Sequence, residues 1–226
     1  MMNNVPVITI DGTSGAGKGV ISQLLAEELS WHFLDSGAIY RVLALVAIRR
    51  KIPLDNVSLL VAAGRDLDVQ FVNQPRLPQK IILAGEEVAN AIRHEECGNV
   101  ASQIAAFTEV RSVLIAHQRS FCKFPGLVAD GRDMGTVVFP NAQLKIFLTA
   151  SVEERARRRL LQLQDQGINA TLGTILKDLT VRDKRDCDRA VSPLKPDPAA
   201  MIIDTTKLSI NEVLQQILAH VKNVHF

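Results

Sequence analysis

Cysteine is scarce in this chain of 226 residues, and the three that occur, Cys97, Cys122 and Cys187, form no Cys-x-x-Cys pair. Zinc sites and disulfide frameworks both need paired cysteines, so neither is predicted. We expect reduced thiols with structural roles. The five histidines also lack the spacing of metal ligands, and no metal site built from protein side chains is predicted.

No targeting signal is predicted, and the sequence has no long apolar run and no large excess of charge. The opening MMNN carries no basic residue, and the longest apolar stretch is VLALVAI, residues 42–48. A bilayer span needs about 20 apolar residues, and a signal peptide needs a basic start. The net charge of +2 does not suit a general polyanion binder. We therefore expect a cytoplasmic protein with no membrane or nucleic-acid partner.

What the chain does contain is an alternation of short apolar strands and amphipathic helices. Residues 5–10 form a β-branched run, and after a glycine-rich turn residues 19–29 carry apolar side chains at helical spacing. Further strands are predicted at 126–131, 144–150 and 199–205. This alternation predicts an α/β fold with a parallel sheet flanked by helices. Ligands of such folds bind at the carboxyl ends of the strands.

The middle of the chain interrupts the alternation. The segments LDVQFV (67–72) and QKIILAG (79–85) flank Pro75 and Pro78 and predict a small antiparallel pair outside the main sheet. Residues 87–124 read as largely helical.

Helix starts carry recognisable capping residues. Ser151 with Glu154, and Ser209 with Glu212, have the spacing of capping boxes. Ser36 is the candidate cap of the helix that ends before Pro53.

A Gly-x-x-x-x-Gly-Lys motif directly follows the first predicted strand, in the segment DGTSGAGKG. Its glycines turn backbone N–H groups toward a phosphate, and Lys18 reaches the β- and γ-phosphates of a nucleotide. Gly19 replaces the usual Ser or Thr, so a Mg²⁺ ion would be held by nucleotide oxygens and water. No guanine-reading Asn-Lys-x-Asp motif occurs. The predicted ATP-binding residues are Gly12, Thr13, Ser14, Gly15, Ala16, Gly17, Lys18, Gly19 and Val20.

Two arginine-rich segments are candidates for contacts to phosphate, because phosphoryl transfer depends on positioning and charge neutralisation. In VRDKRDCDR, helical spacing places Arg182, Arg185, Asp186 and Arg189 on one face, which favours a phosphate clamp. In ERARRR, residues 154–159, the arginines fit a solvated charged face equally well. The segment DGRDMG follows a predicted strand, where Arg132 and Asp133 would meet a ligand.

Together these segments closely resemble the bacterial cytidylate kinases, from residue 5 to beyond residue 210. The segments that carry the resemblance are ITIDGTSGAGKG, WHFLDSGAIYRVLAL, VASQIAAF, LVADGRDMGTVVFPNAQLKIFLTAS, EERARRRLLQLQ and RDKRDCDRAVSPL.

The resemblance implies an enzyme that transfers the γ-phosphate of ATP to CMP or dCMP, with Mg²⁺ carried by ATP. It implies one nucleoside monophosphate kinase domain over residues 1–226, and a monomer. Within this domain it implies a core at about 1–35 and 125–226, a monophosphate-binding insert at about 36–124 and a lid at about 160–185.

The resemblance also implies the acceptor site. Its CMP-binding residues are Ser36, Tyr40, Arg41, Ser102, Arg111, Arg132, Asp133, Arg182, Asp186 and Arg189. The catalytic residues are Lys18, Arg132, Arg182 and Arg189. Asp133 and Ser102 would accept from the cytosine amino group, while Arg111 and Arg132 would donate to the ring acceptors. Asp186 would hold sugar hydroxyls.

One residue departs from the family pattern. Val20 stands where threonine is usual, which removes a hydroxyl expected at the α-phosphate of the donor and should weaken ATP binding.

Two alternatives to CMP phosphorylation stay open on the sequence. One is a kinase of the same fold for another small acceptor, such as UMP or AMP. The other is a P-loop protein that binds nucleotides without catalysis, as a regulatory switch or degenerate binder would.

Overall fold

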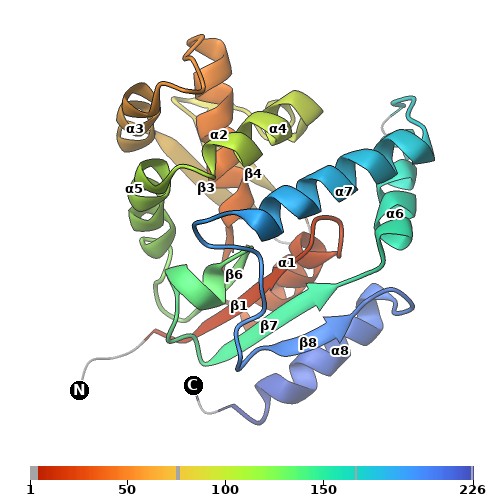
Figure 1. Cartoon of the computed structure of the whole chain (residues 1–226). Helices are drawn as coiled ribbons and strands as arrows, with labels where there is room; N and C mark the ends of the chain where they lie inside the picture. The colour runs from red at the N-terminus through yellow and green to blue at the C-terminus, as the bar shows by residue number, and fades with distance from the viewer. Residues whose placement is uncertain (1–4, 75–76, 166, 225) are drawn as a thin grey trace.

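The computed structural model describes residues 5–226 apart from 75–76, 166 and 225 (Figure 1). Its main sheet has five strands in the order β2-β6-β1-β7-β8. These are β1 (Val7–Gly12), β2 (His32–Asp35), β6 (Leu127–Gly131), β7 (Leu144–Thr149) and β8 (Met201–Asp204). Every neighbouring pair is parallel. The predicted α/β fold is therefore confirmed, and β2 is a strand that the sequence patterns did not predict.

Helices cover both faces of this sheet, which explains the continuous apolar runs in its strands. On one face, Ile8 and Ile10 pack with α1 (Lys18–Leu29) and α8 (Ile210–Val221). On the other face, Val7 packs in the cluster that includes α2 (Ser36–Arg49). The alternation along β1 therefore assigns successive side chains to different halves of the core.

The middle of the chain forms a second lobe (Figure 1). Strands β3 (Val69–Gln74) and β4 (Leu77–Leu83) pair antiparallel, as predicted, and β5 (Glu86–Glu87) extends the pair to a three-stranded sheet. The helical elements around it are α3 (Val57–Arg65), the 3₁₀ turn η1 (Ala91–Arg93), α4 (Glu95–Ile104) and α5 (Thr108–Arg119). Helix α2 contributes ten buried residues, so it is the central element of this lobe's core.

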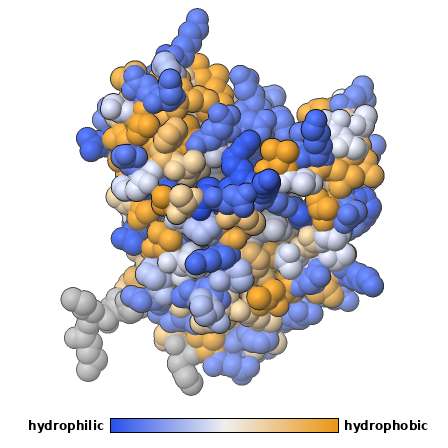
Figure 2. Space-filling view, viewed as in Figure 1, coloured by the Kyte–Doolittle hydropathy of each residue, from blue (hydrophilic) through white to orange (hydrophobic). Residues whose placement is uncertain are grey.

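Two helices lie at the carboxyl edge of the main sheet, across from the middle lobe: α6 (Val152–Asp165) and α7 (Leu172–Asp188). In Figure 1, α7 runs from α6 back toward the middle lobe. Figure 2 shows a band of hydrophilic side chains over α7 on the same face of the molecule. Among the described residues, no helix has the length and apolar character to cross a membrane.

Two capping predictions are wrong in detail. Asp35, the last residue of β2, caps α2 by accepting from Ala38 N at 3.0 Å, and Ser36 is already helical. Ser151 accepts from Glu154 N at 3.2 Å, but the Glu154 carboxylate binds arginines of α6 instead of closing the box. The Ser151 N–H that would close the box donates to Thr206 Oγ1 at 3.0 Å instead.

The capping box at α8 forms as predicted. Ser209 accepts from Glu212 N, and the Glu212 carboxylate accepts from Ser209 N at 2.8 Å.

Gly12 closes β1 at a point where no other residue fits. Its φ is 146°, and a Cβ added there would lie 1.9 Å from the carbonyl oxygen of Leu148 on β7. The Gly12→Ala variant should lose roughly 3 kcal/mol or more of unfolding free energy, because backbone has to move to relieve this clash. Urea denaturation measures the loss.

Gly173→Ala is the matched control, since nothing lies within 4 Å of an added Cβ there. Its stability should change by less than about 1 kcal/mol, in the stabilising direction for a helical site. Equal effects of the two substitutions would contradict the clash at Gly12.

Candidate functional site

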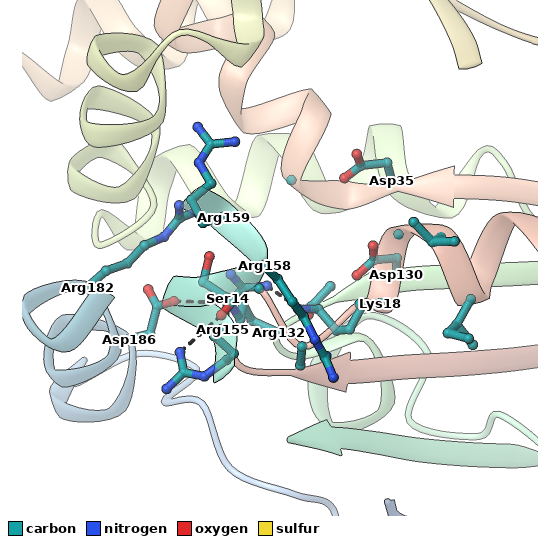
Figure 3. Close-up of a pocket in the computed structure, with 18 of the residues that line it drawn as sticks. Ser14, Lys18, Asp35, Asp130, Arg132, Arg155, Arg158, Arg159, Arg182 and Asp186 are labelled. Carbon is teal, nitrogen blue, oxygen red and sulfur yellow. Dashed lines mark hydrogen bonds and ion pairs between the residues drawn. The ribbon is translucent and has the colours of Figure 1, made fainter. Parts of the chain in front are cut away.

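A cavity of about 720 Å³ opens at the carboxyl ends of the parallel strands. Its wall is built by the glycine-rich loop after β1, the start of α2, parts of α4 and α5, the end of β6, and helices α6, α7 and α8. Figure 3 shows Lys18, Asp130 and Arg132 from the ends of the main-sheet strands close to Arg155 of α6 and to Asp186 of α7. The location is the one that strand topology predicts for a ligand of an open α/β sheet.

The glycine-rich loop has the backbone of a phosphate nest. Gly15 and Gly17 take left-handed φ values of 81° and 90°, and Gly17 is the N-cap of α1. Lys18 is buried and donates its Nζ to the Thr13 carbonyl at 2.8 Å. Residues 14–20 line the cavity, whereas Gly12 and Thr13 lie behind this wall and shape the loop. A helix N-terminus and a buried ammonium therefore share one anion-binding surface.

Burial shifts the titration of the charged groups under the loop. Burial, aided by the nearby Arg132, lowers the pKa of Lys18 to about 7. Burial likewise raises the pKa of Asp130 to about 7, against the opposing effect of Lys18. Near pH 7 both Lys18 and Asp130 are therefore close to their titration midpoints, and an added anion would favour the charged form of Lys18.

Asp11 has a structural role in the same region. Its carboxylate accepts from the backbone N–H groups of Met134 and Gly135, both at 2.8 Å. Burial raises the pKa of Asp11 to about 6, and these two hydrogen bonds limit the rise. The carboxylate thereby ties the end of β1 to the π-helical turn η2 (Met134–Val138), an element that the sequence did not predict.

The residues that the sequence predicts for an acceptor include two aspartates that are paired with arginines. Arg111 and Asp133 form a buried ion pair, and Arg132 Nε donates to Asp186 at 3.0 Å. Burial raises the pKa of Asp186, but Arg132 and Arg182 outweigh it and leave the pKa below its usual value. Arg132 therefore holds the Asp186 carboxylate in one orientation and favours its charged form.

Several buried polar atoms on the cavity wall have no hydrogen-bond partner among the residues that the structure describes. These atoms are Ser102 Oγ, Arg182 Nε and Arg189 Nε. Burial, together with Arg132 and Arg41, lowers the pKa of Arg182 to about 10. Because buried polar groups in native proteins nearly always find partners, this set fits a polar, anionic ligand.

The sequence-predicted acceptor residues all line this one cavity, although they come from segments far apart in the chain. They are Ser36, Tyr40, Arg41, Ser102, Arg111, Arg132, Asp133, Arg182, Asp186 and Arg189. Arg185, which shares their predicted helix face, does not line it. Arg189 lies at the C-cap of α7 with an extended ψ of 130°, so it reaches the cavity from the chain after the helix.

The ERARRR segment, which the sequence left open between function and solvation, contributes to the wall. Arg155, Arg157, Arg158 and Arg159 all line the cavity. Arg155 is 4% exposed, so the reading of it as part of a solvated face is wrong. Asp130 was also missed, and its position at the end of β6 was the signal available.

Metal ligation in this cavity rests on few protein groups. A Cβ added at Gly19 would lie 3.5 Å from Asp130 Oδ2, so this carboxylate borders the position where a P-loop hydroxyl is usual. Among the residues that the structure describes, no group of three or more His, Cys, Asp or Glu side chains is arranged to bind a metal. Asp130 is therefore suited to contact the water shell of a cation that enters the cavity bound to a nucleotide.

Comparison with known proteins identifies close relatives. A family model described as cytidylate kinase matches residues 8–223. A cytidylate kinase of a Marinomonas species is 55% identical over 219 residues, which are 97% of this chain and 96% of the relative. A cytidylate kinase of Shewanella loihica is 52% identical over 222 residues, which are 98% and 96% of the two chains.

Solved structures share the fold at much lower identity. A gluconokinase from Sinorhizobium meliloti 1021 aligns with a TM-score of 0.51 and 13% identity, and the alignment covers 97% of this chain and 93% of the gluconokinase. This likeness supports the architecture alone.

Binding of a polyphosphate should draw protons into the site. Negative charge beside Lys18 and Asp130 raises both pKa values from about 7. At about pH 8 the free protein has largely lost both protons, so ATP binding in EDTA should take protons up, and affinity should fall as pH rises further. Calorimetry in two buffers of different ionisation enthalpy counts the protons.

The Lys18→Met variant is the control, because it removes one of the two titrating groups. It should take up fewer protons than the wild type. Binding without proton uptake by the wild type would contradict the shifted pKa of Lys18.

Proposed function

The chain belongs to the cytidylate kinase family, and from this premise we propose how its cavity performs the reaction. The enzyme is an ATP-dependent phosphotransferase that converts CMP or dCMP to CDP or dCDP. An oxygen of the acceptor's phosphate attacks the γ-phosphorus of ATP, and the bond from that phosphorus to ADP breaks. The observation that supports this assignment best is the single cavity, which joins a phosphate loop to unpartnered buried polar groups on its opposite wall.

The donor nucleotide occupies the loop side. Backbone N–H groups of residues 14–20 surround the β- and γ-phosphates, and Lys18 moves from the Thr13 carbonyl to phosphate oxygens. Arg182 and Arg189 carry unpartnered Nε atoms and stabilise charge on the transferred group. No general base is needed, because the attacking phosphate oxygen is already anionic.

Mg²⁺ belongs to this reaction as part of the nucleotide, as in kinases generally. When bound, it neutralises phosphate charge. Asp130 is the protein group that would face its water shell, and Gly19 supplies no hydroxyl ligand. Its site is therefore built mainly by ATP.

The acceptor base is read by Asp133, Ser102 and Arg111. Arg111 pairs with Asp133, which orients the carboxylate to accept from the amino group at the cytosine 4-position. Ser102 Oγ has no hydrogen-bond partner among the described residues and adds a second acceptor. Uracil has a carbonyl at this position, which would face the Asp133 carboxylate and lose the hydrogen bond to it.

The remaining acceptor contacts hold the sugar and the phosphate. Asp186 takes the sugar hydroxyls while Arg132 keeps its carboxylate oriented at 3.0 Å. Arg41, Arg132 and Arg189 hold the acceptor's phosphate. Arg41 is itself positioned by NH1, which donates to the Ile92 carbonyl at 2.8 Å.

Three parts of the chain cooperate around this cavity. The core comprises about 1–35 and 125–226, the insert about 36–124, and the lid about 160–185 within the core segment. Closure of insert and lid on both substrates excludes water, which protects the γ-phosphate from hydrolysis. The enzyme acts as a cytoplasmic monomer, without nucleic-acid or membrane partners.

A coupled ADP-release assay with Mg-ATP tests the assignment on CMP, dCMP, UMP, AMP and GMP side by side. CMP and dCMP should turn over strongly and UMP weakly. Preference for another acceptor would leave a P-loop kinase but reject the assigned base-reading residues. Absence of turnover on all five would reject the kinase assignment itself.

Ser102→Ala tests the acceptor site without breaking an internal hydrogen bond, since Ser102 Oγ makes none. Loss of one hydrogen bond to CMP, about 1 kcal/mol, should raise KM for CMP about fivefold and leave KM for ATP unchanged. Steady-state kinetics gives both constants. Ser112→Ala, on the exposed side of α5, is the control and should change neither KM for CMP nor KM for ATP. An unchanged KM for CMP in Ser102→Ala would exclude a hydrogen bond between Ser102 and CMP.

Val20→Thr tests the departure from the family pattern. Val20 is 50% exposed and lines the cavity, so a hydroxyl there has room to meet the donor. The variant should lower KM for ATP about fivefold, the equivalent of one hydrogen bond of about 1 kcal/mol. Val20→Ala shortens the side chain without adding a hydroxyl and should not lower KM; a KM for Val20→Thr at or above the wild-type value would reject the explanation.

A further inference from the structure

Arg155 connects three segments that are distant in the sequence. Its Nε donates to the Ala150 carbonyl at 2.9 Å, and NH1 donates to the Ser14 carbonyl in the phosphate loop at 3.0 Å. Its NH2 lies 2.6 Å from Asp183 Oδ2 on α7. The side chain is 5% exposed, so these contacts take up all three nitrogens of a buried guanidinium.

The contact with Ser14 controls part of the phosphate nest. The Ser14 carbonyl and the Gly15 N–H belong to one planar trans peptide and point in opposite directions. Holding the carbonyl from the α6 side therefore fixes the direction of this N–H. Gly15 also packs closely on Arg155, because a Cβ added at Gly15 would lie 3.2 Å from Arg155 Cβ.

Asp183 lies on the helix that carries proposed acceptor contacts. It directly follows Arg182 and precedes Asp186 by three positions, and all three lie within α7. Figure 3 shows Arg182 and Asp186 on α7, with Arg155 and Ser14 close beside them. Over the described part of the chain, Asp183 Oδ1 has no hydrogen-bond partner, so the ion pair with Arg155 is the contact that holds this carboxylate.

We propose that Arg155 and Asp183 are positioning residues that couple the acceptor-binding helix α7 to the phosphate loop. An acceptor that binds Arg182 and Asp186 holds α7 in place. A fixed α7 maintains the ion pair between Asp183 and Arg155, and this pair maintains the hydrogen bond from Arg155 to the Ser14 carbonyl. The loop's N–H groups are then ordered before ATP arrives. Coupling of this kind is reciprocal, so ATP also tightens binding of the acceptor. The inference rests on the proposed function for the identity of the acceptor.

The test measures coupling directly in the full chain. Calorimetry gives the affinity of a non-hydrolysable ATP analogue with Mg²⁺, in the absence and presence of saturating CMP. In the wild type, saturating CMP should increase the affinity for the analogue about tenfold, which is within the usual range of coupling between two sites. Asp183→Asn should reduce this factor to below about threefold, while the affinity for the analogue alone changes little.

Two further variants separate coupling from general destabilisation. Asp178→Asn removes the same charge from an exposed position of α7 and should keep the wild-type factor. Asp183→Glu retains the carboxylate and should keep more of the coupling than Asp183→Asn. Binding of the analogue by each variant alone shows that its loop is folded.

The outcomes distinguish this inference from the proposed function. Failure of CMP to bind the wild type would reject both. CMP binding with no coupling in the wild type, equal coupling in Asp183→Asn, or equal loss in Asp178→Asn would reject the inference alone.

Discussion

The concentration of positive charge around one cavity is the constraint on which the rest of the structure depends. Lys18 and nine arginines line this cavity, and positive charge that is taken out of water is costly unless anionic groups compensate it. Arg111 with Asp133, Arg132 with Asp186 and Arg155 with Asp183 provide three such pairs. What these pairs leave uncompensated, chiefly Lys18, Arg182 and Arg189, is the charge that phosphate groups would neutralise.

This arrangement explains why the aspartates of the site lie where they do. Each paired carboxylate holds an arginine in one orientation. Asp11 has a different task, since it uses both oxygens on backbone N–H groups of η2 and so shapes the floor of the site. Preorganisation of this kind lets the protein stabilise charge in phosphoryl transfer without reorganising during the reaction.

Local sequence patterns predicted most helices and strands correctly, but they predicted side-chain contacts less well. The glycine-rich loop, the α8 capping box and the antiparallel pair at β3 and β4 follow from short-range chemistry, and the structure bears them out. Strand β2 was missed because four residues, HFLD, carry too little periodicity. Ser36 was assigned the cap that Asp35 provides, because either residue type suits an N-cap and the strand's end decides between them.

The sequence by itself determined the fold class and the glycine-rich loop, and its family motifs predicted the residues of an acceptor site. Only the tertiary structure decided which of these charges neutralise one another. Arg132 pairs with a carboxylate 54 positions away, and Arg155 reaches a loop carbonyl 141 positions away. A charged helix face has the same sequence pattern whether it is solvated or buried. The free energy of its ion pairs depends on burial and on the partner residues, and only tertiary packing determines both.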